Sequence, residues 1–233
     1  MKFKFKIQQY QTDAVDAVVK VFGGQPFQER TNFRRDVGTL SAPQQIALEI
    51  DEDGEALNSE VGYKNAAVEL SDEQLLRNIN EIQSQNNIKL SSSLISGQNC
   101  GRCSLDIEME TGTGKTYVYI KTMFELNKRY GWSKFIVVVP SIAIREGVKK
   151  SFEITEDHFM ENYGKKARYF IYNSSNLEQL DTFSSSSGIN VMIINTQAFA
   201  ASLKEDGKSK EARIIFSPRD RCHCGKPSDH YHG

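Results

Sequence analysis

Two kinds of hydrophobic pattern alternate along the second half of the chain, one typical of strands and one typical of helices. Short apolar runs rich in β-branched residues, such as residues 135–139, are typical of strands buried on both faces of a parallel sheet. Segments with apolar residues at helical spacing lie between them. In chain order we predict strands at residues 135–139, 169–172, 191–194 and 212–216, and helices at 141–152, continuing through 163, and at 177–183. This alternation predicts an α/β fold, a parallel sheet with right-handed connections flanked by helices.

The upstream part of the chain divides into two segments. Residues 1–30 combine an alternating stretch with a helical pattern that ends at Gly23, so we predict a strand and a helix. Residues 31–103 differ in character and have an acidic bias, which makes them a poor candidate for contacting phosphates. Their predicted parts are an extended stretch at 39–50, an acidic turn at 51–55, a helix at 70–88 opened by Ser71, and a loop at 91–103. We interpret residues 31–103 as an insertion ahead of a core lobe at 104–217.

A glycine-rich stretch within residues 104–130 carries the clearest chemistry. Alternating apolar residues lead in like a strand, and a helical pattern leads out, as in a phosphate-binding loop. Gly112 and Gly114 can adopt conformations that turn several N–H groups toward a polyphosphate. Lys115 supplies a charge for the β- and γ-phosphates, and the Thr116 hydroxyl can ligate Mg²⁺. The ATP-binding candidates in this stretch are Glu110, Thr111, Gly112, Thr113, Gly114, Lys115 and Thr116.

Gln11, at the start of the N-terminal helix, is a candidate for reading the adenine base. A glutamine amide can both donate and accept hydrogen bonds, as the edge of adenine requires. A surface glutamine at a helix start is the alternative. The phosphate loop further along the chain favours the nucleotide role.

Polar residues follow two of the predicted strands. Pro140, Ser141 and Arg145 follow the strand at 135–139, and Thr196 with Gln197 follows the strand at 191–194. Ligands of such sheets bind at the carboxyl ends of the strands, where the phosphate loop would also lie. Hydroxyl, amide and guanidinium groups there can hold a nucleic-acid backbone without reading sequence. The alternative is that Ser141 and Thr196 cap the helices that follow.

Composition narrows the class of protein. The 233 residues are 39% hydrophobic, enough for a sizeable core, and the net charge of −1 excludes nucleic-acid binding by overall charge alone. We find no apolar run long enough for a bilayer and no secretory signal, so we expect a cytoplasmic protein without a membrane partner. Cys100, Cys103, Cys222 and Cys224 form two close pairs whose spacing is poor for a metal centre. We therefore expect free thiols and no zinc site.

Three stretches together resemble the restriction subunit of type III restriction-modification enzymes, within helicase superfamily 2. They are the loop Met-Glu-Thr-Gly-Thr-Gly-Lys-Thr, the start Gln-Tyr-Gln-x-x-Ala-Val, and the block Val-Val-Pro-Ser-Ile-Ala-Ile-Arg-Glu-Gly-Val at residues 138–148. By this likeness Gln11 matches the adenine-sensing glutamine, and residues 109–116 match helicase motif I. Residues 139–145 match motif Ia, and 195–199 match the next DNA-backbone motif. Helicase-type loops tolerate Met109 in place of the first glycine.

The resemblance implies a RecA-like first helicase lobe that binds ATP and Mg²⁺ and acts on double-stranded DNA. In the family, ATP hydrolysis drives movement or switching on DNA, a C-terminal nuclease domain cuts it, and a DNA methyltransferase subunit supplies site recognition. These are expectations from the likeness, whereas the residue pattern itself indicates a nucleotide-binding α/β domain.

Several parts that the resemblance leads us to expect are missing from this sequence. No Asp-Glu pair follows a predicted strand, so no catalytic set is complete, and neither a second lobe nor a nuclease domain is found. Residues 218–233 lose hydrophobic periodicity and gain Cys and His, which indicates a truncated or frameshifted product. We therefore expect an incomplete lobe without catalytic competence. The alternative is a non-catalytic nucleotide- or DNA-binding module with a metal-binding Cys/His tail.

Overall fold

The computed structural model describes residues 5–28, 31–34, 49–50, 56–57, 61–95, 102–173, 178–198 and 213–215. Its helices and strands in chain order are α1 (Gln9–Val21), β1 (Thr31–Arg34), β2 (Glu49–Ile50), β3 (Ala56–Leu57), β4 (Val61–Lys64), α2 (Asp72–Gln85), α3 (Lys115–Tyr130), β5 (Lys134–Val139), α4 (Ile142–Tyr163), β6 (Ala167–Ile171), α5 (Glu178–Ser185), β7 (Ile189–Asn195) and β8 (Arg213–Ile215). The predicted alternation of strands and helices after the glycine-rich stretch is confirmed. The acidic turn at 51–55 lies outside the described residues.

The main sheet has the strand order β6-β7-β5-β8. β7 pairs in parallel with both β5 and β6, so the predicted parallel sheet is confirmed for these three strands. β8 pairs antiparallel with β5, and for this strand the all-parallel prediction is wrong. An apolar run indicates that a strand is buried, but it does not encode the direction in which an edge strand pairs.

The strand predicted to lead into the glycine turn is absent from the described residues. Residues 103–110 have no regular secondary structure, although Leu105 and Met109 pack against the core. Ile107 is 49% exposed, and the acidic residues on either side of it are exposed as well. Among the described strands, β8 occupies the outer edge of β5. The alternation of apolar and polar residues here therefore reflects packing of one side of the segment against the core, without strand pairing. Residues 5–8 likewise lie outside any strand.

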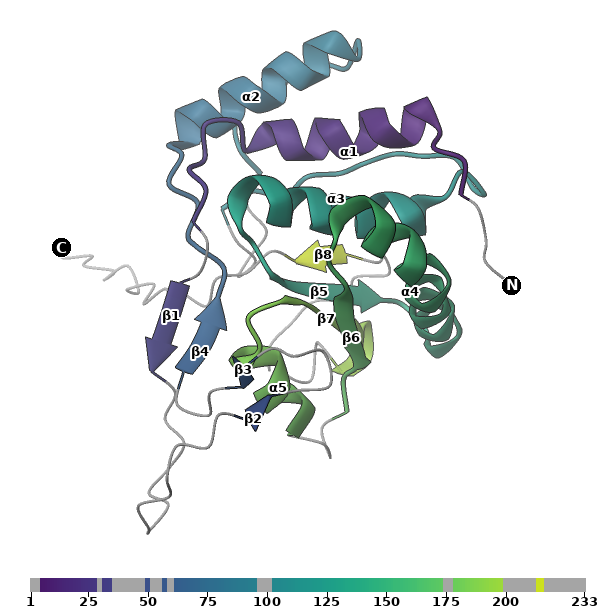
Figure 1. Cartoon of the computed structure of the whole chain (residues 1–233). Coiled ribbons are helices and arrows are strands. Elements are labelled where there is room, and N and C mark those ends of the chain that lie inside the picture. Colours follow the sequence, from purple (N-terminus) through teal and green to yellow (C-terminus); the bar gives the residue numbers. More distant parts are fainter. Residues whose placement is uncertain are drawn as a thin grey trace, which may run out of the picture.

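Helix α3 is held against α1 along its length. The Tyr130 hydroxyl donates to the Val19 carbonyl at 2.9 Å, and Arg129 forms an ion pair with Asp16 at 3.0 Å. Figure 1 shows α1 lying alongside α3, with α2 beyond α1. α4 packs against α3 and against strands β5, β6 and β7. The first helix of the chain is thus part of the same packed body as the helix that follows the glycine turn.

Helix α2 begins as its sequence predicts. The Ser71 hydroxyl accepts from the Gln74 N–H and the Gln74 side chain accepts from the Ser71 N–H, which makes a capping box. Asn78 on this helix donates to the carbonyls of Val21 and Gly23, at 2.9 and 3.0 Å. These bonds attach α2 to the end of α1.

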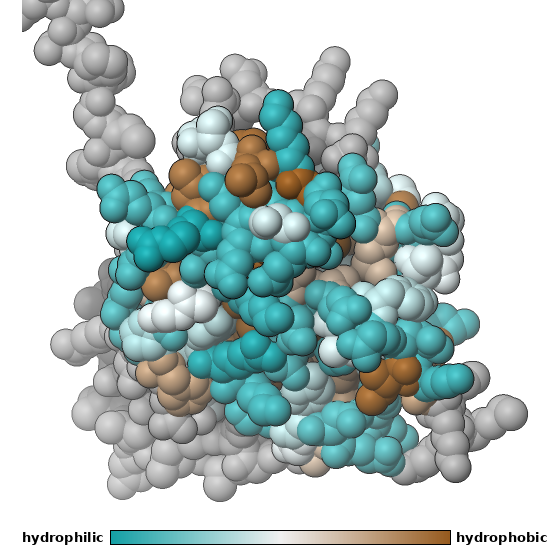
Figure 2. Space-filling view, turned by 90° about the horizontal axis from the view of Figure 1, so that it is seen from above, coloured by the Kyte–Doolittle hydropathy of each residue, from teal (hydrophilic) through white to brown (hydrophobic). Residues whose placement is uncertain are grey.

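The face formed around α1 and α2 is mostly hydrophilic, with separate hydrophobic patches (Figure 2). Exposed apolar side chains in the segment after α2 are Ile88, Leu90 and Ile95. Within the described part of the chain, we find no helix with both the length and the apolar character needed to cross a membrane.

Candidate phosphate-binding site

The glycine turn at residues 110–116 places two glycines in the left-handed region, at Gly112 (φ 83°) and Gly114 (φ 88°). Side chains other than glycine rarely adopt this conformation. The Thr113 hydroxyl donates to the Glu110 carbonyl at 2.7 Å and closes the turn. Gly114 is the N-cap residue, directly before α3. The glycines predicted from the sequence therefore shape a turn directly in front of a helix.

The start of α3 suits an anion. The first N–H groups of a helix have no partner within it, and the helix dipole adds partial positive charge there. Lys115, the first residue of α3, is exposed, and Thr116 beside it is half-buried. An ammonium group, a hydroxyl and several backbone N–H groups thus share one helix end. This set of donors fits a magnesium-bound polyphosphate.

Gln11 reaches the glycine turn from α1. Its Nε2 donates to the Thr113 carbonyl at 2.9 Å, so this donor faces the backbone of the turn in the structure. The Tyr10 hydroxyl donates to the same carbonyl at 3.2 Å. The structure thus brings Gln11 together with the predicted phosphate loop. The structure also places Tyr10 at the turn. Sequence alone offered no reason to select this residue, because an exposed tyrosine in a helix carries no specific signal.

The polar residues after β5 and β7 meet at one end of the sheet. Val139 is in register with Asn195, so residues 140–141 and 196–197 follow neighbouring positions. The Ser141 hydroxyl accepts from the Ile144 N–H at 3.3 Å and caps α4, as the alternative interpretation holds. Thr196 is not the cap of its helix, because the Asn195 side chain accepts from the Ala198 N–H at 2.9 Å.

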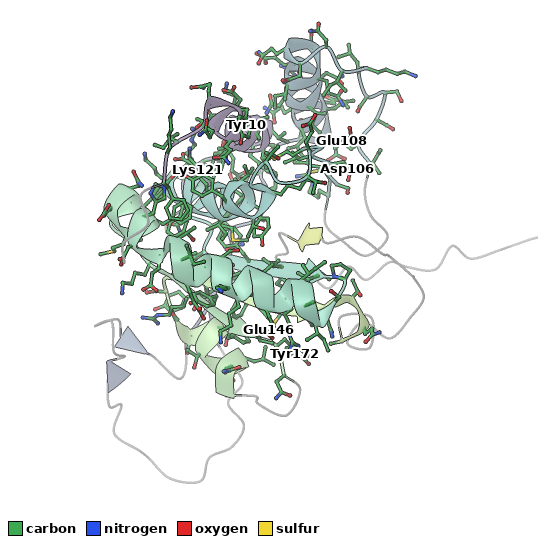
Figure 3. The ribbon with its side chains drawn as sticks, turned by 90° about the vertical axis from the view of Figure 1, so that its right-hand side faces the viewer. Tyr10, Asp106, Glu108, Lys121, Glu146 and Tyr172 are labelled. Carbon is green, nitrogen blue, oxygen red and sulfur yellow. The ribbon has the colours of Figure 1, made fainter. Side chains whose placement is uncertain are left out.

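Arg145 lies in the first turn of α4 and is 22% exposed. Its guanidinium pairs with Glu146 at 3.1 Å, and its buried Nε has no hydrogen-bond partner among the described residues. Figure 3 shows Glu146 well separated from Tyr10, which marks the glycine turn. The first turn of α4 therefore lies apart from the first turn of α1, which contacts the glycine turn.

Tyr117, which follows Thr116, links the start of α3 to α4. Its hydroxyl lies 3.0 Å from Nε2 of His158, and the Phe5 ring packs against the His158 ring at a tilt, with centroids 5.0 Å apart. Burial lowers the pKa of His158, and the nearby Lys121 lowers it further, against an opposing effect of Glu161. The imidazole is therefore neutral at neutral pH. Sequence spacing offered no signal for this pair, which is far apart in the chain.

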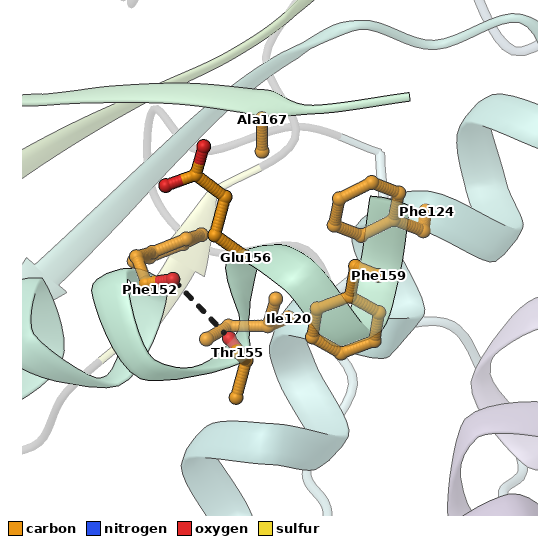
Figure 4. A pocket seen from close by; sticks show the side chains of 7 residues that line it. All are labelled: Ile120, Phe124, Phe152, Thr155, Glu156, Phe159 and Ala167. Carbon is orange, nitrogen blue, oxygen red and sulfur yellow. Dashed lines mark hydrogen bonds between the residues drawn. The ribbon is translucent and has the colours of Figure 1, made fainter. Parts of the chain in front are cut away.

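A small pocket between α3, α4 and β6 is part of the core (Figure 4). Its lining residues are Ile120, Phe124, Phe152, Thr155, Glu156, Phe159 and Ala167. The Thr155 hydroxyl donates to the Ser151 carbonyl at 2.7 Å, and Glu156 pairs with Lys166 at 2.9 Å. The polar groups of Thr155 and Glu156 thus bond within α4 and to a surface lysine, and neither is arranged to hold a ligand.

The described residues contain no group of three or more His, Cys, Asp or Glu side chains placed to hold a metal ion. Cys103 is a free thiol whose pKa is raised, chiefly by burial. Cys100, Cys222 and Cys224 lie outside the described residues, so the alternative of a metal-binding tail stays a prediction.

The fold is an α/β lobe with a parallel sheet flanked by helices, and the family that this chain matches implies a helicase-like lobe. A family model described as the type III restriction enzyme res subunit matches residues 4–231, and the chain belongs to this family. It is 38% identical over 112 residues to the EcoP15I Res subunit of Escherichia coli and 34% identical over 112 residues to the EcoPI Res subunit of Escherichia phage P1. Each match covers 47% of this chain and 11% of the relative.

A third relative is the StyLTI Res subunit of Salmonella typhimurium, 45% identical over 64 residues, or 28% of this chain and 6% of the relative. All three relatives are described as Res subunits of type III restriction-modification enzymes. The chain thus spans a small part of the length of the curated relatives that it matches.

Proposed function

We propose that this chain is the RecA-like, ATP-binding first lobe of a type III restriction enzyme. The observation that carries the proposal is the glycine turn at the start of α3, with Gly112 and Gly114 at positive φ and Lys115 exposed at the helix end. In this assignment Lys115 binds the β- and γ-phosphates and Thr116 ligates Mg²⁺. Membership of the Res subunit family supports it.

The polar residues after β5 and β7 are assigned to double-stranded DNA. Pro140, Ser141, Arg145, Thr196 and Gln197 would contact the phosphate backbone at the end of the sheet, where the register of β5 and β7 brings their segments together. Contacts of this kind position DNA without selecting a sequence, so recognition of the site would come from a methyltransferase subunit. DNA cleavage and movement driven by ATP hydrolysis belong to the whole Res subunit in this proposal, and we place the enzyme in the cytoplasm.

Calorimetric titration with ATP and Mg²⁺ tests the nucleotide site. Lys115→Ala should abolish the binding heat, because it removes the side-chain charge beside the phosphates. Lys89→Ala is the matched control, since Lys89 is an exposed lysine beyond α2. Equal affinity of the parent chain and both variants would refute the assignment of Lys115. Absence of binding in a folded parent chain would refute a competent site in this lobe.

A further inference from the structure

Two side chains of α1 converge on a single carbonyl of the glycine turn. The Tyr10 hydroxyl and Gln11 Nε2 both donate to the Thr113 oxygen, at 3.2 and 2.9 Å. A carbonyl oxygen has two lone pairs, so these two donors use its full capacity. The orientation of this peptide group is therefore set from α1.

The helix that carries these two donors, α1, is attached to α3 by further contacts. The next residue of α1, Thr12, accepts from the Lys121 ammonium of α3 at 3.0 Å. The ion pair of Arg129 with Asp16 and the bond from Tyr130 to the Val19 carbonyl continue the attachment to the far end of both helices. α1 is thus bound at both ends to the helix that begins at the turn. These contacts hold its first turn beside Thr113.

Peptide geometry carries this constraint to the neighbouring N–H. The peptide between Thr113 and Gly114 is trans, and in a planar trans peptide the C=O and N–H bonds point in opposite directions. Because the Thr113 oxygen points at α1, the Gly114 N–H points away from it. This N–H adjoins the first amides of α3, which face the proposed phosphates.

We propose that Tyr10, acting with Gln11, is a positioning residue that aims the Gly114 N–H at the phosphates of the nucleotide. This inference rests on the proposed nucleotide site. It assigns a role to Tyr10, and it predicts that the first turn of α1 influences the affinity for the phosphates. A residue that reads adenine affects ATP alone, whereas a residue that orients the loop affects every ligand with a triphosphate group.

The difference can be measured with three ligands. We would titrate ATP, GTP and inorganic tripolyphosphate, each with Mg²⁺, into the parent chain and into Tyr10→Phe and Gln11→Ala. Loss of one hydrogen bond to the loop should weaken all three ligands by a similar factor, roughly 2- to 10-fold. Tyr172→Phe is the matched control, because Tyr172 lies far from Tyr10 in the molecule (Figure 3). Thermal unfolding of each variant shows whether the fold is kept.

Each outcome decides one of the two ideas. A parent chain that is folded and binds none of the ligands refutes the nucleotide site itself. Binding by the parent chain with unchanged affinities in Tyr10→Phe refutes the role of Tyr10. A loss confined to ATP in the Gln11 variant, with GTP and tripolyphosphate unaffected, shows base reading and also overturns the inference. An equal loss for all three ligands in both variants, with unchanged unfolding temperature, supports it.

Discussion

A β-carbon built on Gly114 lies 2.5 Å from Nε2 of Gln11, well inside the contact distance of two such atoms. The amide of Gln11 fills the space that a side chain at position 114 would need. Gly114 is therefore constrained twice, by its positive φ and by the hydrogen bond that Gln11 makes to the adjacent Thr113 carbonyl.

Gly114→Ala should reduce both stability and nucleotide binding. Forcing alanine into the left-handed region costs about 1–2 kcal/mol of unfolding free energy. The new methyl group also displaces the Gln11 amide, since the end of a glutamine side chain moves more easily than the backbone. We expect the folded variant to bind ATP more weakly than Gln11→Ala does, because loop conformation and hydrogen bond are lost together.

Chemical denaturation and calorimetry give the two quantities. Gly147→Ala is the control, because a β-carbon at Gly147, inside α4, meets no atom within 4 Å. Alanine there should leave nucleotide binding unchanged. Unaltered ATP affinity in Gly114→Ala would show that the turn does not contact the nucleotide.

Local sequence patterns predicted the helices and strands of this fold better than they predicted how these elements pair and pack. β5 and β7 follow from continuous apolar runs, and the start of α2 follows from Ser71 with Gln74, because these signals lie within a few residues of one another. The direction of β8 and the packing of residues 103–110 depend on which sheet edge is open. That information is distributed over the whole chain.

The same limit applies to the candidate site. The glycines and Lys115 could be selected because the motif has fixed spacing, and their place at the start of α3 follows from it. Tyr10 reaches Thr113 across 103 positions of sequence, and Tyr117 reaches His158 across 41. Contacts of this kind arise from helix packing and have no local pattern.

His158 should make stability depend on pH in the mildly acidic range. Its pKa in the folded chain is lowered from 6.5, first by burial. Between the lowered pKa and 6.5 the unfolded chain binds more protons, so the free energy of unfolding falls as pH falls through this window. His158→Gln removes the titration while keeping a donor and an acceptor near Tyr117.

Urea unfolding at about pH 7.5 and about pH 5.5 measures this effect. The parent chain should lose more unfolding free energy between the two conditions than His158→Gln loses. Other titrating groups are present in both chains and cancel in the comparison. An equal loss in both would show that His158 has the same pKa in the folded and unfolded chains.

Asn65 should be important for folding although it lies in the segment predicted to be an insertion. Its side chain is 5% exposed and accepts from the N–H groups of Ser133 and Lys134, both at 2.8 Å. Its amide donates to the Lys134 carbonyl at 2.7 Å. Asn65→Ala leaves these buried backbone groups without this partner, which should cost about 3 kcal/mol of unfolding free energy.

Asn86→Ala provides the matched comparison in urea unfolding. Asn86 is exposed and its amide donates to the Ile82 carbonyl at the end of α2, so we expect a loss below about 1 kcal/mol. A similar small loss for Asn65→Ala would mean that water replaces its side chain at the start of β5.

Arg145 and Glu146 should have opposite effects on DNA binding. The Arg145 guanidinium is partly exposed and, among the described residues, forms its ion pair with the neighbouring, exposed Glu146 at 3.1 Å, so it can exchange this carboxylate for a phosphate. Arg145→Ala should weaken binding of a duplex of any sequence and reduce the slope of log affinity against log salt by about 1. Glu146→Ala should strengthen binding, because it removes a competing carboxylate and its repulsion of the DNA backbone.

Fluorescence anisotropy with a labelled duplex over a series of salt concentrations measures both effects. Arg77→Ala, on the exposed side of α2, changes the net charge as Arg145→Ala does but lies on a different helix. Equal losses in the two arginine variants would show that only total charge matters, and would remove Arg145 from the DNA site. A loss confined to Arg145→Ala, together with a gain in Glu146→Ala, would place the DNA backbone at the start of α4.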